Sequence, residues 1–252
     1  MINNNYTGEL NNLMDRNRAA VIIPVYNHEK NVADVVKQAM GLLLPIYVID
    51  DGSTDSTYEQ VKDIPGITVL RHKKNLGKGA ALMTGFAAAA HTSEWAITMD
   101  ADGQHNPEDS WNLFRVIERG QRPIVVGYRK GMGHRHVPLA SRFGRGFSNF
   151  WVRASGGPSL RDTQSGFRLY PLPEILYIPA DGQRFQYEVE ILARANWKGI
   201  PILEAPVGVN YAPRNERVSH YRGFVDFFRN AATFSRLIFL RWFILPFIRI
   251  RG

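Results

Sequence analysis

Two carboxylates, Asp100 and Asp102, directly follow a short apolar run at residues 95–99. An apolar run of this length is typical of a buried strand, and ligands of open α/β sheets bind beyond the carboxyl ends of the strands. Carboxylate oxygens are the ligands that Mg²⁺ and Mn²⁺ prefer. The pair therefore predicts a divalent metal site that also takes a phosphate group. A purely structural acidic turn is the alternative.

A helix start fixes the far side of this turn. Asn106 is a favoured N-cap residue and Pro107 suits the first helical position. The acidic side chains of Glu108 and Asp109 complement the positive end of the helix. A calcium EF-hand loop is excluded, because Gly103 is the fourth residue from Asp100 where that loop needs glycine at the sixth.

Apolar runs alternate with helical patterns along the chain, which indicates an α/β protein with a largely parallel twisted sheet and helices on both faces. The turns that carry Tyr26, Asp51 and Asp102 then open on one edge of the sheet. This convergence is the main reason to expect a site there. We predict strands at residues 19–25, 46–49, 67–70, 95–99 and 123–127, with one or two more in 200–209 broken by Pro206. We predict helices ending near Met40, at 55–62, at 77–91, from Asn106 to about Arg119, at 140–154 and from Phe185.

Lys78 lies between Gly77 and Gly79 at one of these helix starts. Its spacing fits neither of the two common glycine-rich phosphate-binding patterns. Two interpretations stay open. The first, which we favour, is a glycine-rich helix start without a ligand. The second is a loop that brings Lys78 and backbone N–H groups to a diphosphate.

Six short motifs follow one another along the chain: Pro24-Val25-Tyr26-Asn27, Asp50-Asp51-Gly52-Ser53, Asn75-Leu76-Gly77-Lys78-Gly79, Asp100-Ala101-Asp102-Gly103-Gln104-His105, Asp162-Thr163-Gln164-Ser165-Gly166-Phe167-Arg168 and Glu188-Val189-Glu190. Their types and order resemble those of family 2 glycosyltransferases with the GT-A fold, and the resemblance covers residues 19–221. Within that family, the chain is most similar to the dolichyl- and polyprenyl-phosphate mannose and glucose synthases. The resemblance implies inverting transfer of one hexose from a UDP- or GDP-hexose.

The resemblance also implies roles for individual residues. We assign the nucleotide to Pro24, Val25, Tyr26, Asn27, Asp51, Lys78, Asp100 and Ala101, and the metal ion, Mg²⁺ or Mn²⁺, to Asp100, Asp102 and Gln104. We assign the acceptor to Arg129, Arg145, Ser165, Arg214 and Ser219, and catalysis to Asp102, Arg129, Glu188 and Glu190.

Two acceptor classes stay open. A lipid phosphate such as a polyprenyl phosphate is already an anion and needs no strong base, whereas arginines bind it by charge-assisted hydrogen bonds. A hydroxylated lipid or glycan needs a carboxylate to take its proton, and Glu188 and Glu190 are the candidates. Their bland alternative is a solvated helix start, where acidic residues are favoured by the helix dipole.

The chain has 252 residues, no cysteine and a formal net charge of +8. Disulfides and cysteine-based metal sites are therefore excluded. We divide the chain into a loose polar arm without a secretory signal at 1–18, a catalytic domain at 19–221 and a basic aromatic tail at 222–252. A basic nucleic-acid-binding protein is the outside alternative, although no known binding module is visible.

The tail combines arginines with many aromatic residues. Arg222, Arg229 and Arg236 are seven positions apart and so share one stripe of a helix. Arg236 and Arg241 interrupt the apolar run before it reaches the length of a membrane span. We expect a peripheral protein on the cytoplasmic face of the inner membrane, held at an anionic lipid surface. The alternative is a terminal helix packed on its own domain or on a partner copy.

Overall fold

This computed structural model describes residues 19–130, 139–209 and 223–245, with side chains described at 19–130, 144–209 and 231–245. The predicted arm at 1–18, the ends of the tail, and the acceptor residues Arg214 and Ser219 lie outside these ranges.

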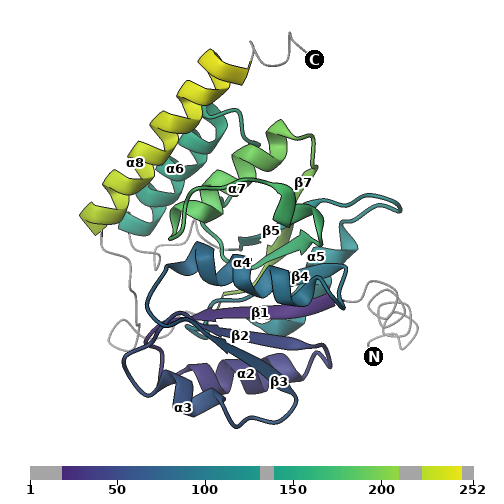
Figure 1. Ribbon diagram of the computed structural model, residues 1–252. Coiled ribbons are helices and arrows are strands. Elements are labelled where there is room, and N and C mark those ends of the chain that lie inside the picture. The colour runs from purple at the N-terminus through teal and green to yellow at the C-terminus, as the bar shows by residue number, and fades with distance from the viewer. Residues whose placement is uncertain (1–18, 131–138, 210–222, 246–252) are drawn as a thin grey trace.

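A seven-stranded sheet in the order β3-β2-β1-β4-β6-β5-β7 forms the centre of the protein (Figure 1). Only β6 runs antiparallel to its neighbours. The carboxyl ends of β1, β2, β4 and β5 therefore meet the amino end of β6 at one edge of the sheet. The strands are β1 (Ala19–Val25), β2 (Ile46–Asp50), β3 (Ile67–Arg71), β4 (Trp95–Thr98), β5 (Ile124–Arg129), β6 (Arg168–Pro171) and β7 (Ile202–Val207).

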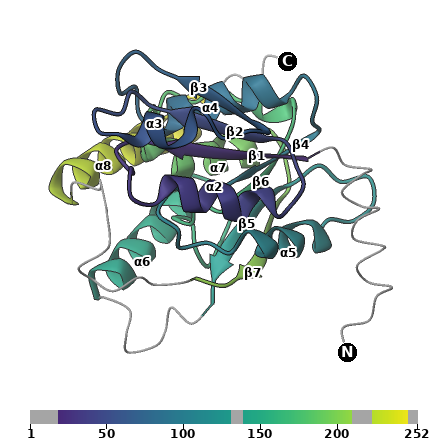
Figure 2. The same cartoon turned by 90° about the horizontal axis from the view of Figure 1, so that it is seen from below.

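Helices cover both faces of this sheet, as the alternating pattern predicts (Figures 1 and 2). Alternate residues of β1 explain the two layers: Val21 and Ile23 pack with α2, α3 and α5, and Ala20 and Ile22 pack with α4 and α7. The helices are α2 (Val32–Met40), α3 (Thr57–Val61), α4 (Lys78–Ala89), α5 (Ser110–Arg115), α6 (Leu139–Ala154), α7 (Gln186–Trp197) and α8 (Gly223–Phe239). Two 3₁₀ turns, η1 (Pro107–Asp109) and η2 (Glu174–Tyr177), and a π-helical turn, η3 (Leu240–Ile244), complete them.

Three elements differ from the sequence prediction. The helix predicted from Asn106 to Arg119 is a 3₁₀ turn followed by α5, although Asn106 does cap it by accepting the Glu108 N–H at 3.1 Å. Strand β7 runs unbroken through Pro206, because β7 is an edge strand and the ring faces away from β5. Strand β6 was not predicted, since Arg168 interrupts the apolar run expected of a buried strand.

Helix α8 packs along α6 and α7 with one face and leaves the other uncovered (Figure 1). Phe234 and Leu237 are buried, and the Phe234 ring stacks on Trp151 of α6. The packed-helix alternative therefore holds for this inner face. Beyond it, Phe239, Trp242 and Phe243 are 55%, 65% and 60% exposed. None of the helices in the described part of the chain is both long and apolar enough to span a bilayer.

Candidate active site

The carboxyl edge of the sheet brings together three charged groups that are far apart in sequence. Asp100 follows β4, Lys78 begins α4, and Glu188 lies in the first turn of α7. Lys78 Nζ is 2.6 Å from Asp100 Oδ1 and 3.0 Å from Glu188 Oε1. Strands β1, β2 and β4 are parallel, so the turns that carry Tyr26, Asp51 and Asp102 open on this same edge, as the sequence predicts. Lys78 lies between the two carboxylates of the cluster.

The electrostatics of the two aspartates differ. Burial would raise the pKa of Asp100, but the adjacent Lys78 ammonium lowers it. Burial and repulsion by Asp100 raise the pKa of Asp102 to about 6. Burial also works against the charge of Lys78, yet Asp100 and Glu188 raise the Lys78 pKa.

Burial and the nearby Asp100 carboxylate both disfavour a charged Asp102, and a cation bound at the pair would offset that cost. Asp102 Oδ1 also accepts the backbone N–H of Gln104 at 3.0 Å, which tightens the turn. Over the residues described, no three His, Cys, Asp or Glu side chains converge as a metal cage. The aspartate pair fits an ion such as Mg²⁺ that takes one or two protein carboxylates and completes its shell with water and substrate phosphates.

The loop at residues 162–167 packs directly against Asp100. A Cβ added to Gly166 would overlap the Asp100 carboxylate, and Thr98 Oγ1 donates to the Gly166 carbonyl at 2.7 Å. Phe167 stacks on the His105 ring with centroids 5.0 Å apart. Burial lowers the His105 pKa, and within the described residues its buried Nδ1 has no hydrogen-bond partner.

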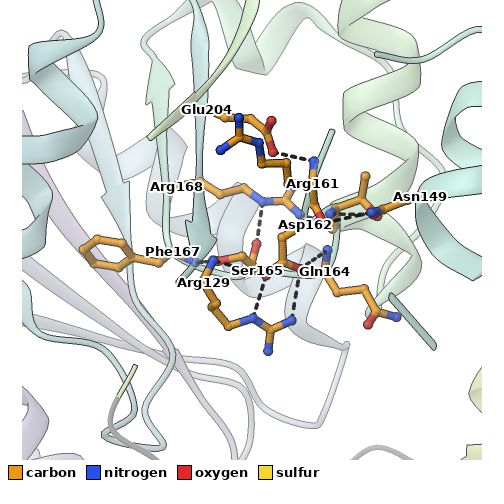
Figure 3. Close-up of polar contacts among 10 residues, drawn as sticks. Arg129, Asn149, Arg161, Asp162, Gln164, Ser165, Phe167, Arg168 and Glu204 are labelled. Carbon is orange, nitrogen blue, oxygen red and sulfur yellow. Dashed lines mark hydrogen bonds and ion pairs between the residues drawn. The ribbon is translucent and has the colours of Figure 1, made fainter. Parts of the chain in front are cut away.

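Two arginines hold this loop from opposite sides (Figure 3). Arg129 makes a two-pronged contact with Asp162, through Nε at 2.6 Å and Nη2 at 3.0 Å. Arg168 is fully buried and donates to the carbonyls of Ser165, Thr163 and Glu188 at 2.7, 2.8 and 2.6 Å. Arg168 therefore joins the loop to the first turn of α7.

These contacts place the predicted acceptor residues. Arg129 ends β5 at the site edge with its guanidinium on Asp162. Ser165 is buried, and its hydroxyl accepts the Phe167 N–H at 3.4 Å inside the loop. Arg145 is half-buried on α6.

The predicted nucleotide residues lie along the ends of β1 and β2. Pro24, Val25 and Ala101 are buried, and Tyr26 and Asn27 are half-buried. Asn27 Oδ1 accepts the Thr54 N–H at 2.8 Å, which joins the two turns.

Asp51 closes the loop that leads into α4. Its Oδ2 accepts the Gly77 N–H at 2.7 Å, and its Oδ1 accepts the Leu76 N–H at 2.9 Å and lies 2.7 Å from His72 Nδ1. The Asp51 carboxylate is buried, and these contacts hold residues 72–77 in place.

The structure explains why glycine stands on either side of Lys78, which neither interpretation of the sequence did. A second loop, residues 181–184, crosses directly over them, and a Cβ on Gly77 or Gly79 would overlap its backbone. Gly77 also has a φ of 105°, which favours glycine. The glycines therefore permit a close approach of two chain segments at the point where Lys78 enters the site.

Glu188 and Glu190 are both buried, so the alternative of a solvated helix start does not hold for either. Two positions apart on a helix, they face different ways. Glu188 faces Lys78 and the site. Glu190 accepts the Gly182 N–H at 2.8 Å and binds Arg194 Nε at 2.6 Å and Arg236 Nη2 at 2.8 Å.

Sequence reasoning gave no role to three residues that shape this site. His105 and Arg168 stand inside motifs, and Asp162 opens one, but their functions depend on contacts with distant segments. The one signal available was position: His105 follows the Asp-x-Asp pair by three residues, and Asp162 and Arg168 flank a glycine-containing turn.

Comparison with known proteins places this site in a family. The sequence profile of Glycosyl transferase family 2 matches residues 20–172. An uncharacterized protein of Methanocaldococcus jannaschii is 32% identical over 213 residues, covering 79% of this chain and 84% of that one. The UDP-N-acetylglucosamine–dolichyl-phosphate N-acetylglucosaminyltransferase of Methanococcus voltae is 29% identical over 213 residues, covering 76% and 85%.

A solved structure has the same fold. Glucosyl-3-phosphoglycerate synthase from Mycobacterium tuberculosis, in complex with Mn²⁺, UDP-glucose and phosphoglyceric acid, superposes with a TM-score of 0.68 at 20% identity. The match covers 93% of this chain and 82% of that one. The predicted GT-A fold is confirmed.

Proposed function

Because this chain belongs to glycosyltransferase family 2, we propose that it transfers one hexose from UDP- or GDP-hexose to a polyprenyl phosphate, with the help of Mg²⁺ or Mn²⁺. The observation that carries the proposal is the Asp100–Lys78–Glu188 cluster at the carboxyl edge of the sheet. Membership of an enzyme family sets aside the interpretation as a nucleic-acid-binding protein.

The negatively charged donor diphosphate would lie near two positive groups, the metal ion and the Lys78 ammonium. Asp100 and Asp102, with Gln104, would hold the metal ion, which supplies positive charge to the departing diphosphate. Lys78 stands 2.6 Å from Asp100 and offers its ammonium from the other side. The two backbone turns after β1 and β2 would hold the base and ribose through Pro24, Tyr26 and Asp51.

The acceptor assignment follows from the chemistry of the site's bases. Of the two glutamates in the Glu188-Val189-Glu190 motif, Glu188 is the one that faces Lys78. It already forms an ion pair with the Lys78 ammonium. An acceptor that is already an anion has no proton for a base to remove, so it leaves this carboxylate free to stay paired with the ammonium. The M. voltae relative is named for transfer to dolichyl phosphate, and that name supports the same acceptor class here.

A hydroxylated lipid or glycan is the second candidate. One observation favours it: the Glu188 side chain is only 8% exposed and lies at the site, where a base would be needed. Glu190 fits this role poorly, because its oxygens accept hydrogen bonds from Gly182 and two arginines away from Asp100.

The tail supports a membrane location for the acceptor. Phe239, Trp242 and Phe243 are exposed at the end of α8, and Arg241 lies between them in sequence. Aromatic rings beside arginine suit the headgroup layer of an anionic membrane. We therefore keep the proposal of a peripheral protein on the cytoplasmic face, with residues 222–252 as its interface segment.

Radiolabelled donors tested with a short polyprenyl phosphate separate the two acceptors. A mild-acid-labile lipid product, formed nearly as well by Glu188→Gln, would support the phosphate acceptor. Absence of product with any polyprenyl phosphate, together with labelling of a hydroxylated lipid that Glu188→Gln abolishes, would overturn it in favour of the second candidate.

A further inference from the structure

The loop at residues 181–184 lies between the acidic cluster and the C-terminal helix α8. On its inner side it packs on the start of α4: the Gln183 carbonyl accepts the Ala80 N–H at 3.1 Å. A Cβ on Gly77 would overlap the same carbonyl. Arg184 Nη1 donates to Asn75 Oδ1 at 3.0 Å. The position of this loop therefore determines the position of the segment that carries Lys78.

One buried carboxylate, that of Glu190, holds the loop from its other side. Gly182 N–H donates to Glu190 Oε2 at 2.8 Å, and Asp181 N–H donates to Oε1 at 3.3 Å. Arg236 of α8 reaches both acids: its Nη2 lies 2.8 Å from Glu190 Oε1 and its Nη1 2.7 Å from Asp181 Oδ2. A single guanidinium thus connects α8 to the loop.

Apolar packing does little to hold the loop on this side. A cleft of about 380 Å³ separates it from α8. Where close packing is missing, hydrogen bonds and ion pairs decide where a segment lies. Here they are the contacts of Glu190 and Arg236, together with those of Arg194, whose Nε lies 2.6 Å from Glu190 Oε1 and whose Nη2 lies 3.1 Å from Asp181 Oδ2. The cleft is lined by polar residues apart from one alanine and one glycine: Asp181, Gly182, Gln183, Arg184, Gln186, Ala232, Thr233 and Arg236.

We propose that Glu190 and Arg236 are positioning residues for the donor side of the site. They hold loop 181–184 over Gly77 and Gly79, and so keep Lys78 between Asp100 and Glu188. The proposal rests on the proposed function only in taking Lys78 to lie at the donor diphosphate. In this scheme the Glu190 carboxylate acts through the hydrogen bonds and ion pairs that it accepts.

Amide hydrogen exchange tests the positioning directly and needs no substrate. In the full chain, Arg236→Gln should speed exchange of the Ala80 N–H by about tenfold, as expected when one member of a coupled network is lost. Arg236→Lys should restore part of the protection. Arg241→Gln is the matched control, because Arg241 follows the same helix but lies against Gly156. Exchange in Arg236→Gln equal to that in the control would overturn the proposal.

Nucleotide affinity gives a second readout. We would titrate UDP and GDP, each with MnCl₂, and use whichever binds the unmodified chain. Glu190→Gln and Arg236→Gln should each weaken binding by about tenfold, and the double variant should be no weaker than either, since both act through one network. A base role for Glu190 would instead abolish turnover in Glu190→Gln while leaving affinity and exchange unchanged, and would refute the proposal. If neither nucleotide binds the unmodified chain, the proposed function fails, and the exchange experiment still decides the positioning.

Discussion

Replacing Lys78 with methionine tests the charge balance on which the site depends. Methionine keeps the length of the side chain and removes the ammonium, which leaves Asp100 and Glu188 without their shared partner. Removing one member of a buried ion pair costs about 3–5 kcal/mol, because the remaining charge stays buried and unpaired. The Asp100 side chain is 29% exposed, so water screens part of this loss, and we expect about 3 kcal/mol, the lower end of that range.

The loss should depend on pH in a defined direction. Lys78 lowers the pKa of Asp100 below its ordinary 3.8 against the effect of burial. A carboxyl whose folded-state pKa is lowered contributes stability above its unfolded pKa, and this contribution disappears as the pH falls through the folded value. The difference in unfolding free energy between the parent and Lys78→Met should therefore be complete at pH 7. It should shrink as the pH falls through the Asp100 pKa of the variant, which burial raises once the ammonium is gone, toward the lowered Asp100 pKa of the parent.

Urea unfolding at pH 7, 5 and 4 measures this difference. Lys73→Met is the matched control, since Lys73 is exposed just before α4 and should change stability by less than about 0.5 kcal/mol. A loss in Lys78→Met of less than about 1 kcal/mol at pH 7, or one that grows as the pH falls, would refute the ion-pair reasoning.

Three further outcomes are expected. Asp102→Asn should lower turnover by about two to three orders of magnitude while the fold survives; full activity of this variant, or of the parent in chelator, contradicts the metal site. Asp51→Ala should weaken nucleotide binding more than it slows turnover, and should lower stability by about 2 kcal/mol because three contacts of the 72–77 loop are lost; unchanged affinity by calorimetry argues against it. Trp242→Ser combined with Phe243→Ser should release the protein from anionic liposomes, whereas salt should weaken the parent's attachment only partly; equal flotation of the two proteins rules this out.

The elements that build the site edge were predictable from local patterns. Strands such as β1 and β4 are uninterrupted apolar runs. The turn after β4 carries Asp100 and Asp102, whose carboxylates indicate a metal site. Parallel strand order then places the turns after such strands together without any knowledge of side-chain contacts. The Asp100–Asp102 turn and its Asn106 cap were therefore predicted in their places.

Contacts between distant segments were not predictable in this way. Lys78 and Glu188 are 110 positions apart, so nothing local indicates that they form an ion pair. The four-residue β6 is held in the sheet by its neighbours and places Gly166 against Asp100. The sequence made Glu190 a catalytic candidate because it shares a motif with Glu188. In the structure, the Glu190 side chain contacts loop 181–184 and α8 instead.

The two ends of α7 set the distance between the candidate active site and the proposed membrane-contacting residues. Glu188, in the first turn of α7, binds Lys78 at the candidate site. Trp197 ends the helix beside Gly156 and Arg241, and Arg241 directly precedes the exposed Trp242 in sequence. The nine residue steps from Glu188 to Trp197 span roughly 14 Å. If only Trp242 and Phe243 entered the headgroup layer and the protein stood upright on them, a lipid phosphate would have to rise by about that distance, pulling several isoprene units into water. If α8 lay along the plane of the membrane instead, the lipid phosphate would not have to leave the headgroup layer by this distance. For the proposed polyprenyl phosphate acceptor, the orientation of the protein on the bilayer would thus be constrained by the low solubility of the acceptor's own tail in water.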